Sequence, residues 1–173
     1  LRVGGCDVGC HWCDVKESWN PEIHPLTKVD KMISSILEYP SDTVVVTGGE
    51  PLMSNQVWKL FDWFNENPSK MRFAINSNLM AKDSLIDRLI ERSQGVNDFH
   101  LYTSCEATYK QAEYIRDGLN YTDWHSQVLH MMVDKVPSEI HNMATINALC
   151  LESLPEFLEK IVWFKNASKS ICF

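Results

Sequence analysis

The chain has 173 residues, which is close to the roughly 100 to 200 residues of one domain. Apolar residues make up 45% and charged residues 23%, near the average of soluble globular proteins, which excludes a collagen-like, coiled-coil or low-complexity chain. Lys and Arg number 16 against 23 Asp and Glu, and the net charge of -7 provides no overall positive field for a nucleic-acid backbone.

Strand-like and helix-like segments alternate along the chain. The clearest strand is 43–47, which is β-branched throughout and ends at Gly48-Gly49. Pattern and turn signals predict further strands at 71–76, 99–104 and 141–149. Helical periodicity predicts helices at 27–39, 54–67 and 82–92. A further helical region begins at 109, is interrupted by Gly118 and continues over 122–132. Pro155 opens a last helix, which ends at 164.

This alternation predicts an α/β fold with a parallel sheet, either a doubly wound sheet or a barrel. We expect one domain over residues 1–173. In both architectures ligands bind at the carboxyl ends of the strands. Functional residues are therefore sought in the segments that follow strands, which are 6–13, 48–51, 76–78, 104–106 and 145–147.

No stretch approaches the roughly 18 to 20 consecutive apolar residues of a membrane-spanning helix, and no basic segment precedes an apolar one near the start. We therefore expect a cytoplasmic protein with no membrane partner. The chain opens on Leu1 rather than Met and stops at Phe173, so we expect a fragment that is truncated at both ends.

Three of the six cysteines lie within eight residues, as Cys6-x3-Cys10-x2-Cys13. Without a signal peptide, this asymmetric spacing favours a shared metal over a disulfide framework. Three thiolates suit an iron–sulfur cluster with one open iron. They also suit a structural zinc ion, with His11 or His24 as the fourth ligand. The scattered cysteines are interpreted as small apolar side chains, namely Cys105, Cys150 and Cys172.

The cysteine loop, with Trp12 just before its last Cys, resembles the cluster loop of the radical S-adenosylmethionine superfamily. The run Gly48-Gly49-Glu50-Pro51 is similar to that superfamily's second motif. The resemblance implies a partial (β/α)6 barrel and a [4Fe–4S] cluster on Cys6, Cys10 and Cys13. It further implies that S-adenosylmethionine is cleaved reductively to a radical that abstracts a substrate hydrogen.

The same resemblance implies which residues contact S-adenosylmethionine. Backbone groups at Gly48 and Gly49, with the charge of Glu50, would face the methionyl ammonium. The other contacts implied by strand ends and by the cluster loop are Asn76, Ser77, Asn78 and Asp14. Ser and Asn are also common turn and helix-capping residues, and Gly-Gly is often only a turn, so these structural interpretations stay open.

Residues 1–53 resemble the family of 7-carboxy-7-deazaguanine synthases, most clearly over 2–19. This resemblance implies a pterin-like substrate, 6-carboxytetrahydropterin, whose carboxylate Arg2 would hold by a bidentate fork. The other residues interpreted as substrate contacts are Gly4, Lys16 and Glu106. Magnesium-binding members often have Thr where this chain has Val15, whose side chain cannot coordinate Mg²⁺.

Residues 54–165 instead resemble radical enzymes with a small twitch extension, whose substrates are mostly unassigned. The alternatives are therefore a synthase and a twitch-type enzyme. A noncatalytic zinc or iron–sulfur module is the alternative from another class, and a tRNA-binding enzyme fits the charge of -7 poorly. The expected partners are an electron donor such as flavodoxin or ferredoxin and, by resemblance to the synthases, a second copy of the chain.

Overall fold

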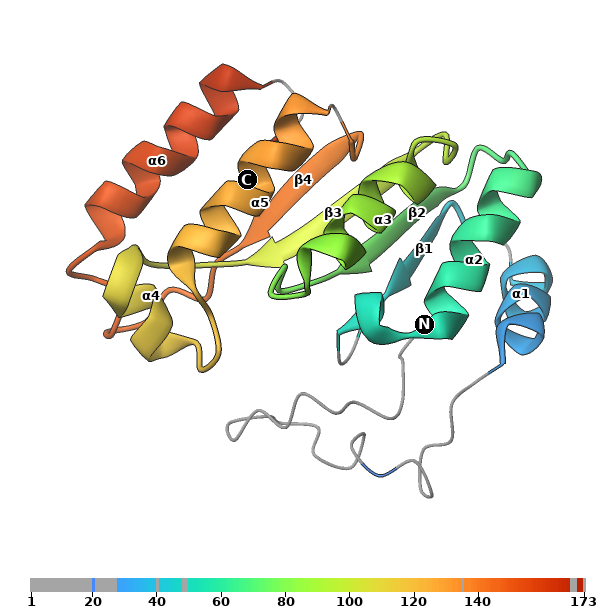
Figure 1. The fold of residues 1–173 in the computed structure, drawn as a ribbon, viewed down its shortest axis with the longest axis horizontal. Helices are drawn as coiled ribbons and strands as arrows, with labels where there is room; N and C mark the ends of the chain where they lie inside the picture. Colours follow the sequence, from blue (N-terminus) through green and yellow to red (C-terminus); the bar gives the residue numbers. More distant parts are fainter. Residues whose placement is uncertain are drawn as a thin grey trace.

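The computed structural model of the protein describes residues 20, 28–39, 41–47, 50–134, 136–168 and 171–172. Five strands form one sheet, and every neighbouring pair is parallel (Figure 1). The strands are β1 (Thr43–Val46), β2 (Arg72–Asn76), β3 (Phe99–Ser104), β4 (Glu139–Met143) and β5 (Ile171–Cys172). Their spatial order follows the order of the sequence, as in the wall of a barrel, and the described strands show no reversal of a doubly wound sheet.

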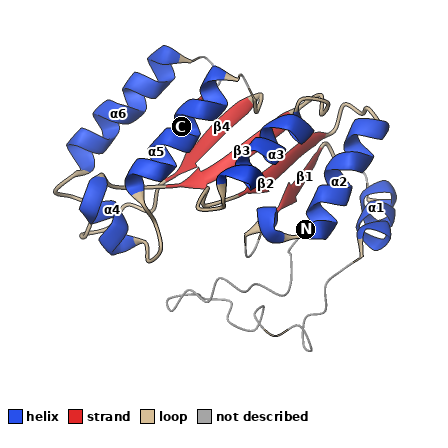
Figure 2. Cartoon of the chain, in the orientation of Figure 1, coloured by secondary structure: helices blue, strands red, loops and turns tan. Residues whose placement is uncertain are grey.

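Helices connect the strands and lie in a layer over one face of the sheet (Figure 2). They are α1 (Val29–Glu38), the short 3-10 helix η2 (Pro51–Met53), α2 (Asn55–Glu66), α3 (Asp83–Ser93), α4 (Tyr109–Ile115), α5 (Tyr121–Val133) and α6 (Leu154–Ala167). Consecutive right-handed crossovers between sequential strands place the helices on a single face. Within the described ranges no helix combines the length and the apolar character that crossing a membrane requires.

The first half of the core consists of aromatic side chains between β2, β3 and α2. Phe73 of β2 lies 4.5 Å, ring centre to ring centre, from Phe64 and 4.8 Å from Phe61. Phe61 in turn lies 5.2 Å from Phe99, the register partner of Phe73 on β3. All four are buried, because alternate residues of each strand point toward the helices.

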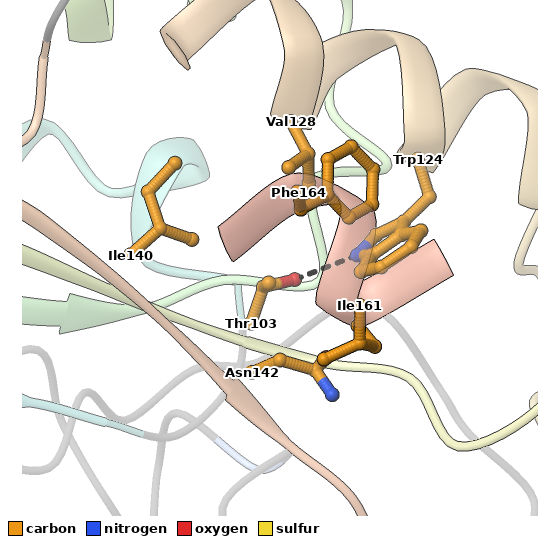
Figure 3. Close-up of a pocket in the computed structure, with 7 residues that line it drawn as sticks. All are labelled: Thr103, Trp124, Val128, Ile140, Asn142, Ile161 and Phe164. Atoms are coloured by element: carbon orange, nitrogen blue, oxygen red, sulfur yellow. Dashed lines mark hydrogen bonds between the residues drawn. The ribbon is translucent and has the colours of Figure 1, made fainter. Parts of the chain in front are cut away.

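The second half of the core lies between β3, β4, α5 and α6 (Figure 3). The Trp124 indole is buried there and donates from Nε1 to Thr103 Oγ1 over 2.9 Å. The remaining space measures about 10 Å³, which is at most the room of one water molecule. This pocket is therefore a packing gap of the core, too small for a ligand.

The α/β fold with parallel strands predicted from the sequence is confirmed, and the helix break at Gly118 falls between α4 and α5, where this glycine has φ +81°. The predicted strand at 141–149 is wrong at both ends, since β4 is Glu139–Met143. Asn147 explains the early end, because its side-chain oxygen accepts from Leu149 N and its amide donates to Thr145 O. Such local bonds favour a turn over continued pairing.

Phe73→Ala should lower the free energy of unfolding by about 3–5 kcal/mol, because it removes the ring that touches both Phe61 and Phe64. Urea unfolding measures the loss. Leu158→Ala, at an exposed position of α6, is the matched control and should change stability by less than about 0.5 kcal/mol. Equal effects of the two substitutions would contradict the placement of the core.

Candidate functional site

The carboxylate of Glu50 joins the segment after β1 to the segment after β2. Its Oε1 accepts from Leu52 N over 3.1 Å and from Ser77 Oγ over 2.8 Å. Its Oε2 accepts from Asn78 N over 3.1 Å. Because parallel strands end at the same edge, one side chain can hold both segments. The sequence-predicted residues Glu50, Ser77 and Asn78 are thus brought together at the carboxyl edge of the sheet.

Burial and hydrogen bonds act on the charge of the Glu50 carboxylate in opposite directions. Burial raises the pKa of its carboxyl above the ordinary value of 4.5, and the bonds from Leu52, Ser77 and Asn78 act in the opposite direction. A buried carboxylate needs such donors to offset the loss of hydration. The three donors therefore stabilise the Glu50 carboxylate and connect it to the neighbouring segments at the carboxyl edge of the sheet.

The turn after β2 uses most of its polar side-chain atoms locally. The Ser77 hydroxyl is buried, donates to Glu50 and accepts from Leu79 N over 3.1 Å. Asn78 Oδ1 accepts from Met80 N over 2.8 Å. Leu79 is buried in the left-handed region at φ +59°, a conformation that costs about 1–3 kcal/mol and is typical of functional sites and tight turns. The turn interpretation of Ser77 and Asn78 thus has direct support.

Asn76 differs from the two residues that follow it. As the last residue of β2 it is two positions from Ala74 and lies on the face away from the helices. Its side-chain amide makes no hydrogen bond to any residue that the structure describes, and it is only partly buried. An amide both donates and accepts, so Asn76 offers a polar group at the end of β2 that makes no bond within the described residues.

Glu106, which follows β3, forms a buried ion pair. Arg116 donates to Glu106 Oε2 from Nε over 2.8 Å and from a terminal nitrogen over 2.7 Å. The side chain of Glu106 is 4% exposed and that of Arg116 is 21% exposed. Arg116 was not predicted from the sequence, although Glu106 and Arg116 are opposite charges on either side of α4 and could have indicated the pair. The role of Glu106 as a substrate contact stays a prediction.

Several predicted residues lie outside the described part of the chain. These are Arg2, Gly4, Cys6, Cys10, His11, Cys13, Asp14, Lys16, His24, Gly48 and Gly49. Residues 145–147 lie in the exposed turn after β4. The small-apolar interpretation of Cys105 and Cys150 is confirmed, because both are free and buried. Burial raises the pKa of the Cys105 thiol to about 12, so it is inert as a nucleophile.

Comparison with known families matches residues 2–161 to the radical SAM superfamily. This chain belongs to the radical SAM superfamily. The match includes the cysteine loop, the Glu50 segment and strands β1 to β4, so the strand-end site lies within the matched region.

Curated relatives are similar to only part of the chain. The 7-carboxy-7-deazaguanine synthase of Flavobacterium psychrophilum is 64% identical over 52 residues, which are 30% of this chain and 24% of the relative. The synthase of Synechocystis sp. is 47% identical over 53 residues, 31% of this chain and 26% of the relative. The matched segment thus spans about a quarter of the length of these relatives.

Two solved structures resemble most of the fold. The crystal structure of Streptococcus suis SuiB bound to S-adenosylmethionine has a TM-score of 0.69 and 14% identity, covering 95% of this chain and 35% of SuiB. SuiB bound to its precursor peptide SuiA has a TM-score of 0.72 and 15% identity, covering 95% and 37%. At this identity the likeness shows the fold alone.

Arg116→Ala should lower the free energy of unfolding by about 3–5 kcal/mol, because it leaves the Glu106 carboxylate buried without its partner. Urea unfolding at neutral pH provides the measurement. Arg92→Ala is the matched control, since Arg92 pairs with Asp62 on the surface, where both side chains are 39% exposed, and should cost about 0–1 kcal/mol. The buried-pair interpretation fails if the two arginines prove equally dispensable.

Proposed function

We propose that this chain is the core of a radical S-adenosylmethionine enzyme in which Cys6, Cys10 and Cys13 hold a [4Fe–4S] cluster. The observation that carries the proposal is the superfamily match over residues 2–161, which includes both the cysteine loop and the Glu50 segment. Three thiolates leave one iron of a cubane cluster open for a further ligand. When bound, the cluster and S-adenosylmethionine together supply a 5'-deoxyadenosyl radical that abstracts a hydrogen atom from the substrate.

Among the described residues at the carboxyl edge, Asn76 supports a contact with S-adenosylmethionine. The free amide of Asn76 offers a donor and an acceptor, so we assign it a direct contact with S-adenosylmethionine. Glu50 and Ser77 act as positioning residues, because their polar atoms bond to each other and to the adjacent backbone. Asn78 contributes through its backbone bond to Glu50.

The proposed substrate is 6-carboxytetrahydropterin, which a 7-carboxy-7-deazaguanine synthase converts to a deazapurine. The partial identity with two curated synthases supports this choice. In this proposal Arg2 holds the substrate carboxylate, and Gly4, Lys16 and Glu106 complete the substrate contacts. The electron that reduces the cluster for the cleavage of S-adenosylmethionine comes from a donor of the flavodoxin or ferredoxin type.

The test uses the full chain, reconstituted without oxygen with iron and sulfide and then given S-adenosylmethionine, a reductant and 6-carboxytetrahydropterin. Mass spectrometry should detect both 5'-deoxyadenosine and 7-carboxy-7-deazaguanine. Cys10→Ala should abolish both products, because it removes a cluster ligand. Cys150→Ala is the matched control: it also removes a cysteine, but a buried one outside the loop, and should keep both products.

The two products separate the alternatives. Formation of 5'-deoxyadenosine without the deazapurine would support the radical enzyme and refute the synthase, leaving a twitch-type enzyme with another substrate. Absence of both products from protein that retains its cluster absorption would refute catalysis and favour a noncatalytic iron–sulfur module. A colourless protein that holds zinc on the three thiolates would refute the cluster itself.

A further inference from the structure

A second cluster of polar side chains lies at the amino ends of β3 and β4, opposite the edge that carries Glu50. His100 is the second residue of β3, and Glu139 and His141 are the first and third residues of β4. Glu139 is the register partner of His100, and His141 follows two positions later on the same face. Two hydrogen-bonded strands therefore fix these three side chains relative to one another.

The ligand atoms of the three side chains converge on one point. His100 Nδ1 lies 2.7 Å from His141 Nε2, and Glu139 Oε2 lies 3.6 Å from the first and 3.4 Å from the second. A tetrahedral zinc ion with bonds of ~2.0–2.2 Å separates its ligand atoms by about 3.3 Å. The distances to Glu139 are close to this value, and the two imidazoles need to separate by only about half an ångström.

Asp98 sets the orientation of the buried imidazole. Its Oδ1 lies 2.8 Å from His100 Nε2, and a carboxylate accepts, so the proton is on Nε2 and the Nδ1 lone pair faces His141 and Glu139. Arg72 donates from Nε to Asp98 Oδ2 over 3.2 Å and holds the carboxylate in place. A carboxylate behind a histidine is the usual second partner of a metal-binding imidazole.

Exposure and charge also suit a cation. His100 is 1% exposed, whereas the side chains of His141 and Glu139 are 21% and 40% exposed, so an ion can enter from their side. Two carboxylates, those of Asp98 and Glu139, lie beside the two imidazoles, and Arg72 pairs with Asp98. Burial, together with the neighbouring His100, lowers the pKa of His141.

We propose that His100, Glu139 and His141 bind a divalent transition-metal ion, with zinc the ion that this ligand set fits best. Two imidazoles and one carboxylate satisfy three positions of a tetrahedral ion and leave the fourth for water or a ligand. Such an ion would fasten β3 to β4 at the amino edge of the sheet. The site uses none of the residues of the proposed cluster or of the carboxyl edge, so it stands independently of the proposed function.

Calorimetric titration with Zn²⁺ tests the site in the full chain with Cys6, Cys10 and Cys13 each replaced by Ser, so that the loop thiolates do not compete. One equivalent should bind. His141→Ala should weaken binding at least tenfold, and Asp98→Asn, which alters the group behind His100 and its pair with Arg72, should weaken it about 10–100-fold. His130→Ala is the matched control, because His130 pairs with a carboxylate, Asp134, on the surface of α5, and it should bind as the parent does.

The proposal is overturned if the parent shows no saturable binding near one equivalent, or if His141→Ala binds as tightly as the parent. Either result would leave a hydrogen-bonded histidine pair without a metal. Should the triple Ser variant fail to fold, Co²⁺ absorption of the unaltered chain separates the two kinds of site. His141→Ala should then remove the weak visible bands of a nitrogen and oxygen site and keep the intense sulfur-to-cobalt absorption of the loop; unchanged visible bands would refute the site.

Discussion

The arrangement of the carboxyl edge depends on the hydrogen bonds that the Glu50 carboxylate accepts. Through Ser77 Oγ and Asn78 N it connects the segment after β1 to the turn after β2. The backbone of the same turn continues the connection, since Ser77 N donates to Tyr102 O of β3 over 2.9 Å. The Glu50 carboxylate thus holds two strand ends relative to each other, and a backbone bond joins the second of them to β3. Asn76, the residue with a free amide, is held within this frame.

The fold could be predicted because its strands and helices have local patterns that agree with their tertiary environment. The β-branched run that forms β1 and the apolar face of α2 each show the periodicity of the element that they form. The end of β4 at Met143 could not be predicted in this way, because apolar residues continue past Met143 while the side chain of Asn147 closes a turn. Side-chain bonds to the nearby backbone outweighed strand propensity there.

For the candidate site, topology predicts which residues lie close together, but it does not predict what their side chains contact. Strand ends predict that Glu50, Ser77 and Asn78 lie close together, and they do. Whether Ser77 contacts a ligand or the protein depends on hydrogen bonds between segments 27 residues apart, which no local pattern encodes. The histidine cluster was missed for a related reason. With a strand expected to start at 141, Glu139 fell outside it, and the shared face with His141 could not be recognised.

The central claim is that Glu50 acts through Ser77 to hold the two strand ends together. A double-mutant cycle tests it most directly, using the free energies of unfolding of the wild-type chain, Glu50→Ala, Ser77→Ala and the double variant. Because both single substitutions remove the same contact, the double variant should lose less than the sum of the two, by about 0.5–3 kcal/mol. Losses that add to within about 0.3–0.5 kcal/mol would contradict the claim.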